Sequence, residues 1–79
     1  MNEEEKAKIY KSLKEINDKI INYERKSAIE LIRKVRFEHP GKEQIAYVFN
    51  NTSLDEGNDE MIINTLKAEA YRLTLKIKD

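Results

Sequence analysis

Residues 9–23 read IYKSLKEINDKIINY, and the spacing of their apolar side chains decides the fold of the chain. The apolar positions are Ile9, Leu13, Ile16, Ile20 and Tyr23, so the steps alternate between four and three residues. These steps average about 3.5 residues, which is the period of a helix that packs along another helix. The stretch therefore predicts an amphipathic α-helix with one packing seam.

The predicted helix extends from about Glu3 to about Phe37. Three carboxylates lie at its start and three cations at its end, where each sign of charge interacts favourably with the helix dipole. These residues are Glu3, Glu4, Glu5, Arg33, Lys34 and Arg36. The apolar positions continue at Ala28, Leu31, Ile32 and Val35. A continuous helix over this range would be about 50 Å long, too long for the rest of the chain to cover.

Ser27 leaves the continuity of this helix open. Ser27 and Glu30 have the spacing of a capping box, in which a hydroxyl and a carboxylate satisfy free N–H groups at a helix start. A capping box here would divide the segment into two helices that break near Ser27. No Gly or Pro lies between Asn22 and Lys26. A continuous helix is therefore the expected form.

The chain's single Pro and first Gly, Pro40 and Gly41, end this segment. Proline suits the first position of a new helix, because its missing N–H would have no partner there. A short helix is therefore expected over residues 42–49. The β-branched and aromatic residues at 44–49 also fit a strand, but a lone strand would have no other strand to pair with. Residues 50–58 are expected to form a polar loop in which Leu54 turns inward.

A final helix is expected after Gly57 and Asn58, either of which fits the capping position, with Asp59 and Glu60 in its first turn. Its main apolar positions are Ile62, Leu66, Ala70, Leu73 and Ile77. A second apolar set is formed by Met61, Ile63, Ala68, Tyr71 and Leu75. Together they make a stripe wider than one neighbouring helix needs. The sequence thus predicts a single all-α domain over residues 1–79, a small bundle of three helices with the last helix packed back along the first.

Self-association is expected to complete this bundle. Domains of fewer than about 80 residues often need a disulfide, a metal or a partner for stability. The chain has no Cys and a single His, His39, so a second copy of the chain is the remaining common solution. The predicted oligomer interface is the N-terminal seam, formed by Ile9, Leu13, Ile16, Ile20 and Tyr23.

The sequence offers no constellation for catalysis or for a metal. A nucleophile needs an adjacent base, and His39 is expected to face solvent at a helix end. The acidic run at 55–60 resembles a calcium loop in composition, but an EF-hand requires Gly at the sixth position and Glu at the twelfth. Counted from Asp55, those positions are Glu60 and Leu66. We therefore expect neither an enzyme nor a bound metal or cofactor.

The corner at residues 36–43 is a candidate anion site. Gly41 would let a ligand approach the backbone, and N–H groups at a helix start would point towards it. Arg36, His39 and Lys42 would supply positive charge. Such a site would suit a small anionic ligand resembling a nucleotide.

Charge and hydropathy limit the partners. The 15 Lys and Arg balance the 15 Asp and Glu, whereas a protein that binds DNA through phosphate contacts usually has a basic excess. The turn of a helix-turn-helix motif is also shorter than residues 50–57. Nucleic-acid binding is therefore a second alternative only. The acidic N-terminus and the short apolar runs predict a cytoplasmic protein without membrane contact.

Binding to another protein is the leading functional prediction. The Tyr residues, distributed over every predicted helix, are of the type enriched at protein interfaces. The Lys-, Glu-, Ile- and Asn-rich composition is similar to that of small regulators of bacteria and phages. The sequence thus predicts a non-enzymatic, homo-oligomeric regulator or inhibitor.

Overall fold

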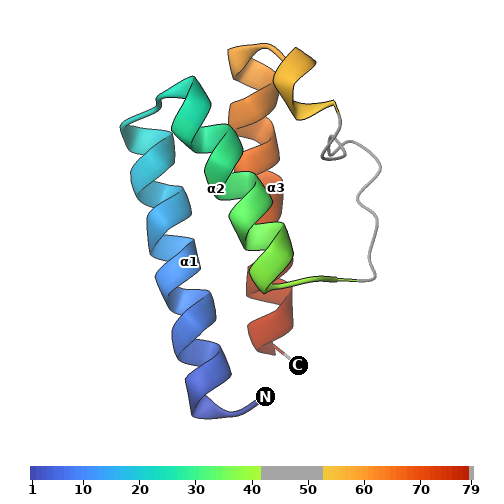
Figure 1. Ribbon diagram of the computed structural model, residues 1–79. Coiled ribbons are helices and arrows are strands. Elements are labelled where there is room, and N and C mark those ends of the chain that lie inside the picture. The colour runs from blue at the N-terminus through green and yellow to red at the C-terminus, as the bar shows by residue number, and fades with distance from the viewer. Residues whose placement is uncertain (42–52, 79) are drawn as a thin grey trace.

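The computed structural model describes residues 1–41 and 53–78. It contains helices α1 (Glu3–Ile21), α2 (Arg25–Glu38) and α3 (Asp59–Lys78), with one 3-10 turn, η1 (Leu54–Glu56), before α3 (Figure 1). The described residues contain no strand. The prediction of a small all-α bundle of three helices is confirmed, although α1 and α2 together occupy the segment that was expected to form one continuous helix.

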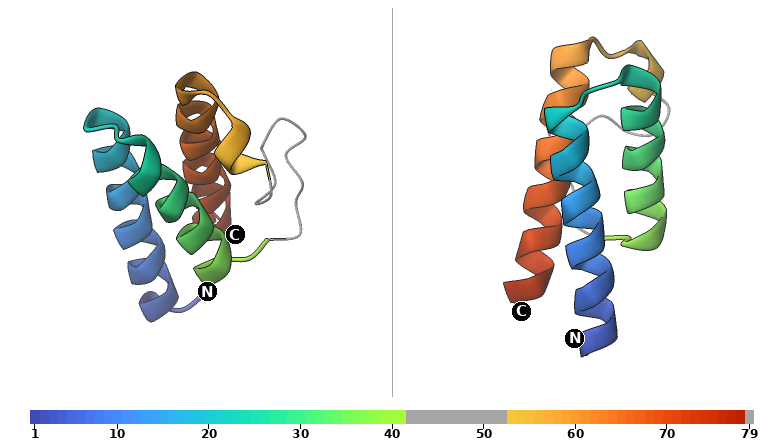
Figure 2. Two further views of the ribbon diagram at one scale, coloured as in Figure 1. Left: turned by 45° about the horizontal axis from the view of Figure 1, so that its top comes forward. Right: turned by 90° about the vertical axis from the view of Figure 1, so that its left-hand side faces the viewer.

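The helices form a compact up–down–down arrangement (Figures 1 and 2). α1 and α2 form an antiparallel hairpin, and α3 runs antiparallel to α1 and in the same direction as α2. α3 packs against both of the other helices, so the predicted return of the last helix along the first is confirmed.

The expected continuous helix from Glu3 to Phe37 is wrong, because the chain turns between α1 and α2. Asn22 ends α1 with a non-helical backbone, at φ −111° and ψ 63°. Glu24 then caps α2, since its carboxylate accepts a hydrogen bond from the N–H of Ser27 at 3.0 Å. Ser27 Oγ returns a hydrogen bond to the same carboxylate at 3.2 Å. Ser27 is therefore part of a cap, as the alternative prediction had it, but as the third residue of the helix rather than its capping residue.

This turn removes one of the arguments for self-association. A 35-residue rod would have needed a second chain to cover it, whereas the folded hairpin lies against α3. The prediction of an oligomer then depends on the small size of the chain and on the wide apolar stripe of its last helix.

Apolar side chains from all three helices and η1 meet in one core. Those exposed by no more than 9% are Ile9, Ile16, Ala28, Ile29, Leu31, Ile32, Val35, Leu54, Ile62, Leu66, Ala68 and Leu73. The expected inward position of Leu54 is confirmed, since this side chain is fully buried. Burial of one such Leu or Ile stabilises the fold by about 1.5–3 kcal/mol.

Residue Asn58 caps α3 as predicted, because its Oδ1 accepts a hydrogen bond from the N–H of Met61 at 2.8 Å. Asp59 and Glu60 occupy the first turn. The short helix or strand expected at 42–49, and the first part of the polar loop at 50–52, lie outside the described residues.

Candidate functional site

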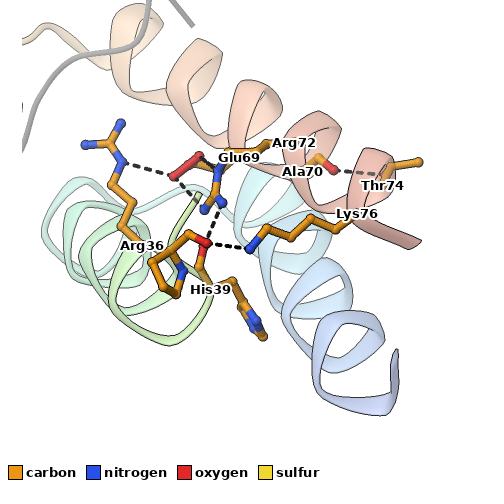
Figure 3. Close-up of polar contacts among 8 residues, drawn as sticks. Arg36, His39, Glu69, Ala70, Arg72, Thr74 and Lys76 are labelled. Carbon is orange, nitrogen blue, oxygen red and sulfur yellow. Dashed lines mark hydrogen bonds and ion pairs between the residues drawn. The ribbon is translucent and has the colours of Figure 1, made fainter. Parts of the chain in front are cut away.

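A buried carboxylate binds two guanidinium groups where the end of α2 packs against α3 (Figure 3). Glu69, on α3, is 2% exposed. It accepts hydrogen bonds from Arg36 Nε at 3.0 Å and from Arg72 Nε at 2.9 Å. We call Arg36, Glu69 and Arg72 the polar corner. Each charge at this position has an opposite charge within hydrogen-bonding distance, as buried ions require.

Two cations of α3 also bind the carbonyl groups that follow α2. Arg72 Nη1 donates to the carbonyl oxygen of His39 at 2.6 Å, and Lys76 Nζ donates to that of Pro40 at 2.6 Å (Figure 3). The last carbonyl groups of a helix lack partners within the helix. Because α2 and α3 run in the same direction, side chains of one helix reach the free carbonyl groups of the other.

His39 does not face solvent, and this expectation was wrong. It is 9% exposed, and its Nε2 lies 3.1 Å from Oγ of Ser12 on α1, in a buried contact. Burial lowers the pKa of His39 below its ordinary value, and the nearby charges of Lys76, Arg72 and Lys8 lower it further, while Glu38 opposes them. The uncharged imidazole is therefore the favoured form near neutral pH.

The structure places the predicted anion-site residues as follows. Arg36 is in the ion pair with Glu69, and His39 is turned towards Ser12. The space beside Gly41 is occupied by Arg72, whose Nη1 would lie 2.9 Å from a Cβ added to Gly41. Lys42 lies outside the described residues. The expected open approach at Gly41 is thus filled by the chain's own guanidinium group.

A pocket of about 320 Å³ lies between α1 and α2 beside His39. It is lined by Lys8, Lys11, Ser12, Glu15, Lys34, Glu38 and His39. Lys34 Nζ is 3.2 Å from the Glu15 carboxylate, so part of this charge is already neutralised within the pocket. The mixed charges give the pocket no clear preference for one sign of ligand.

The contacts of α1 show which of its sides faces α2. Ser12 contacts His39, Glu15 pairs with Lys34, and Lys19 Nζ donates to Ser27 Oγ. Residues 12, 15 and 19 form one stripe, because successive residues of a helix are rotated by about 100°. The opposite stripe of α1 contains Tyr10, Leu13 and Asn17, with Ile20 and Ile21 at its upper end.

The contacts of α3 likewise show which of its sides faces α2. Glu69, Arg72 and Lys76 contact the end of α2 and so mark its α2-facing side. Around α3, the α2-facing side is followed by the side that faces α1 and then by a stripe on the surface opposite α2. By the rotation of about 100° per residue, this last stripe contains Ile63, Ala70, Thr74 and Ile77. The stripes of α1 and α3 then lie side by side on the surface away from α2, which is the left side of the right-hand view in Figure 2.

We call this surface the open α1–α3 face. Its apolar members are Tyr10, Leu13, Ile20, Ile21, Ile63, Ala70 and Ile77. Tyr10 is 57% exposed and Ile21 is 69% exposed, and the other five are half-buried. No helix among residues 1–41 and 53–78 covers them.

The predicted oligomer seam is divided between this face and the core. Ile9 and Ile16 are 2% and 1% exposed within the single chain, so they have almost no area left for a partner. Leu13, Ile20 and Tyr23 are partly buried against the core. Tyr23 Oη donates to Asp59 at 2.8 Å. Burial and this hydrogen bond to a carboxylate raise the pKa of Tyr23.

The polar corner was missed at the sequence level. The apolar stripe expected on the last helix passes through Ala70, and neither Glu69 nor Arg72 was expected at a packing position. A signal was nevertheless present, because positions 62, 66, 69 and 73 alternate by four, three and four residues. That spacing places Glu69, rather than Ala70, on the packing side of α3.

Residues 1–41 and 53–78 contain no group of three His, Cys, Asp or Glu side chains placed to hold a metal ion. Over the same residues, no helix combines the length and the hydrophobicity needed to cross a bilayer. Comparison of the chain with protein-family models, with curated proteins and with solved structures gave no match.

Proposed function

We propose that this protein is a non-enzymatic binding module that contacts another protein through the open α1–α3 face. The observation that supports the proposal is the row of two exposed and five half-buried apolar residues on the side opposite α2. Contiguous apolar patches on a small soluble domain commonly mark interaction sites.

The contacts of the polar corner favour protein binding at the open α1–α3 face over anion binding at residues 36–43. Arg36 and Arg72 are paired with Glu69, and Arg72 and Lys76 bind backbone carbonyl groups. An anion that entered here would have to displace these internal partners. Because these cations already bind groups of the chain itself, we favour the open α1–α3 face as the binding surface.

Matched pairs of surface substitutions test this proposal. Tyr10→Lys and Ile21→Lys place a charge on the open α1–α3 face, whereas Tyr71→Lys and Phe37→Lys place one at other exposed aromatic positions. Tyr71 is 59% exposed and Phe37 is 87% exposed, so all four variants should fold. Immobilised wild-type protein and each variant would be incubated with lysate of the expressing cells, and retained proteins would be quantified.

The two variants of the open α1–α3 face should lose a retained partner, and Tyr71→Lys and Phe37→Lys should keep it. Loss of the partner in the Phe37 or Tyr71 variant alone would contradict the proposal. Sedimentation of the wild type over a range of concentrations measures self-association separately, and the predicted homo-oligomer requires a mass above that of one chain.

A further inference from the structure

The open α1–α3 face carries positive charge along its middle. Lys6 and Lys14 lie on the same side of α1 as Tyr10 and Leu13, and Lys67 lies on the same side of α3 as Ile63 and Ala70, by the rotation of about 100° per residue. Lys14 and Lys67 are exposed and Lys6 is half-exposed. Among the acidic residues near the face, Glu3 and Glu60 lie at its two ends, and Asp18 follows Lys14 by one helical turn.

Lys14 and Lys67 lie opposite each other across this face. The hydrogen bond between Tyr23, which follows α1, and Asp59, at the start of α3, brings these two helix ends together. Residues 14 and 67 both lie about halfway along their antiparallel helices, so they lie at a similar level. Neither lysine forms an ion pair with a residue in 1–41 or 53–78, unlike Lys34 and Arg33, which pair with Glu15 and Asp55. The face thus combines partly buried apolar residues with two lysines that form no ion pair within residues 1–41 and 53–78.

We propose that the occupant of this face is an amphipathic helix of another protein whose apolar stripe is flanked by acidic residues. This inference rests on the proposed function and names the class of partner. A helix that lies along the groove between α1 and α3 would cover the apolar residues and complete a four-helix arrangement. Glu or Asp residues beside its apolar stripe would lie next to Lys6, Lys14 and Lys67.

A second copy of the chain fits this face less well. Two copies related by a two-fold axis present the same surface to each other. Lys14 and Lys67 lie near the middle of the face, so an axis through the middle would bring lysines of one copy close to lysines of the other. Like charges placed opposite each other disfavour a complex, whereas an acidic partner turns the same lysines into a source of attraction.

Two synthetic helices provide the probes. Both have Leu at the a and d positions of three heptads and Ala at most other positions, and they differ only at e and g, which are Glu in one peptide and Lys in the other. Binding to the full chain would be measured by fluorescence anisotropy at low and high salt. Amide chemical shifts would show which residues of the protein the peptide contacts.

The Glu peptide should bind about fivefold more tightly than the Lys peptide at low salt, and the difference should shrink at high salt, because exposed ion pairs are weak and screened. Lys14→Glu with Lys67→Glu should reverse the preference. Lys11→Glu with Lys26→Glu makes the same change in net charge at exposed positions outside the face and should preserve it.

Three results would overturn the inference. Equal binding of both peptides at the open α1–α3 face would contradict a preference for an acidic partner but not the proposed binding function of the face. A wild-type dimer that is dissociated by Leu13→Lys would make a second copy the occupant. Binding to vesicles of phosphatidylcholine and phosphatidylglycerol that is lost in Lys14→Glu with Lys67→Glu would identify a lipid surface instead. Failure of the proposed function itself is recognised separately, by partner retention that survives Tyr10→Lys and Ile21→Lys.

Discussion

The apolar core, which joins all three helices, and the polar corner, which joins α2 to α3, stabilise the fold by different physical means. In the core, side chains such as Leu66 and Ile32 are fully buried among other apolar side chains, and their attraction has no preferred direction. In the corner, Glu69, Arg36 and Arg72 interact through hydrogen bonds at 2.9–3.0 Å between defined atoms. The core therefore provides most of the driving force for folding, and the corner is expected to fix how α2 and α3 lie along each other.

The largest effect should come from removing the carboxylate at the centre of the polar corner. Glu69→Leu leaves Arg72, which is 5% exposed, as a buried charge without a counter-ion. Breaking a buried pair in this way usually destabilises a protein by about 3–5 kcal/mol. Urea unfolding followed by circular dichroism would measure the loss.

The double variant Glu69→Leu with Arg72→Leu tests whether that loss arises from the charge. It should be more stable than Glu69→Leu alone, since no unpaired guanidinium then remains buried. If the loss of stability in the double variant equalled the sum of the losses in Glu69→Leu and Arg72→Leu, the unpaired charge would not be the cause.

A large but less specific effect is expected in the core. Leu66→Ala removes a fully buried side chain and should destabilise the fold by about 2–5 kcal/mol. No second substitution in the corner should restore this stability, because the loss arises from a cavity. Leu66→Met, which nearly conserves volume, serves as the control and should cost less than about 1.5 kcal/mol.

Acidification should lower the free energy of unfolding through the protonation of His39. Because burial lowers the pKa of His39 in the folded state, the unfolded chain takes up this proton first as the pH falls. Stability contributed by the neutral imidazole should therefore decline below about pH 6.5 and level off below the folded-state pKa. Urea unfolding at a series of pH values measures this slope.

The slope should largely disappear in His39→Gln, which does not titrate. Charged groups near the ring are Glu38, Lys76, Arg72 and Lys8, so a slope that persists in His39→Gln would assign the pH dependence to other groups.

The smallest effect is expected at Gly41. An added Cβ would meet Arg72 Nη1 at 2.9 Å, so the guanidinium would have to move slightly. Replacement of Gly by Ala also lowers the entropy of the unfolded chain, which favours folding by about 0.4–1 kcal/mol. Gly41→Ala should thus change stability by less than about 1 kcal/mol, as measured by thermal unfolding. In an Arg72→Leu background the same change should be more favourable, and an unchanged effect would show that Arg72 does not limit the space.

The difference between core and corner also explains what the sequence could predict. Ile9, Ile16, Ile62, Leu66 and Leu73 were expected at packing positions because periodicity reports apolar burial directly. Glu69 and Arg72 have the same periodicity, but a charged residue at a helical position is usually solvated. Their burial depends on Arg36, a partner 33 residues away, which a local pattern does not reveal.

The break between α1 and α2 was present in the sequence but outweighed by composition. The step from Tyr23 to Ala28 covers five residues, which would rotate the apolar stripe of a continuous helix away from its seam. Helix-favouring residues and the absence of Gly and Pro from 22–26 indicated continuity instead. Glu24 is not a usual capping residue, yet its carboxylate performs the capping role through Ser27, and these contacts lower the pKa of Glu24.

The packing of α3 against both of the other helices has a consequence for the order of folding. Polar side chains of α1 contact α2 and its C-cap, as Ser12 contacts His39, whereas the shared apolar core includes Ile62, Leu66 and Leu73 of α3. The N-terminal hairpin therefore should not be stable before α3 has docked, which requires closure of the connection over residues 39–58. During synthesis, the chain should remain without fixed tertiary structure until its last helix has been made.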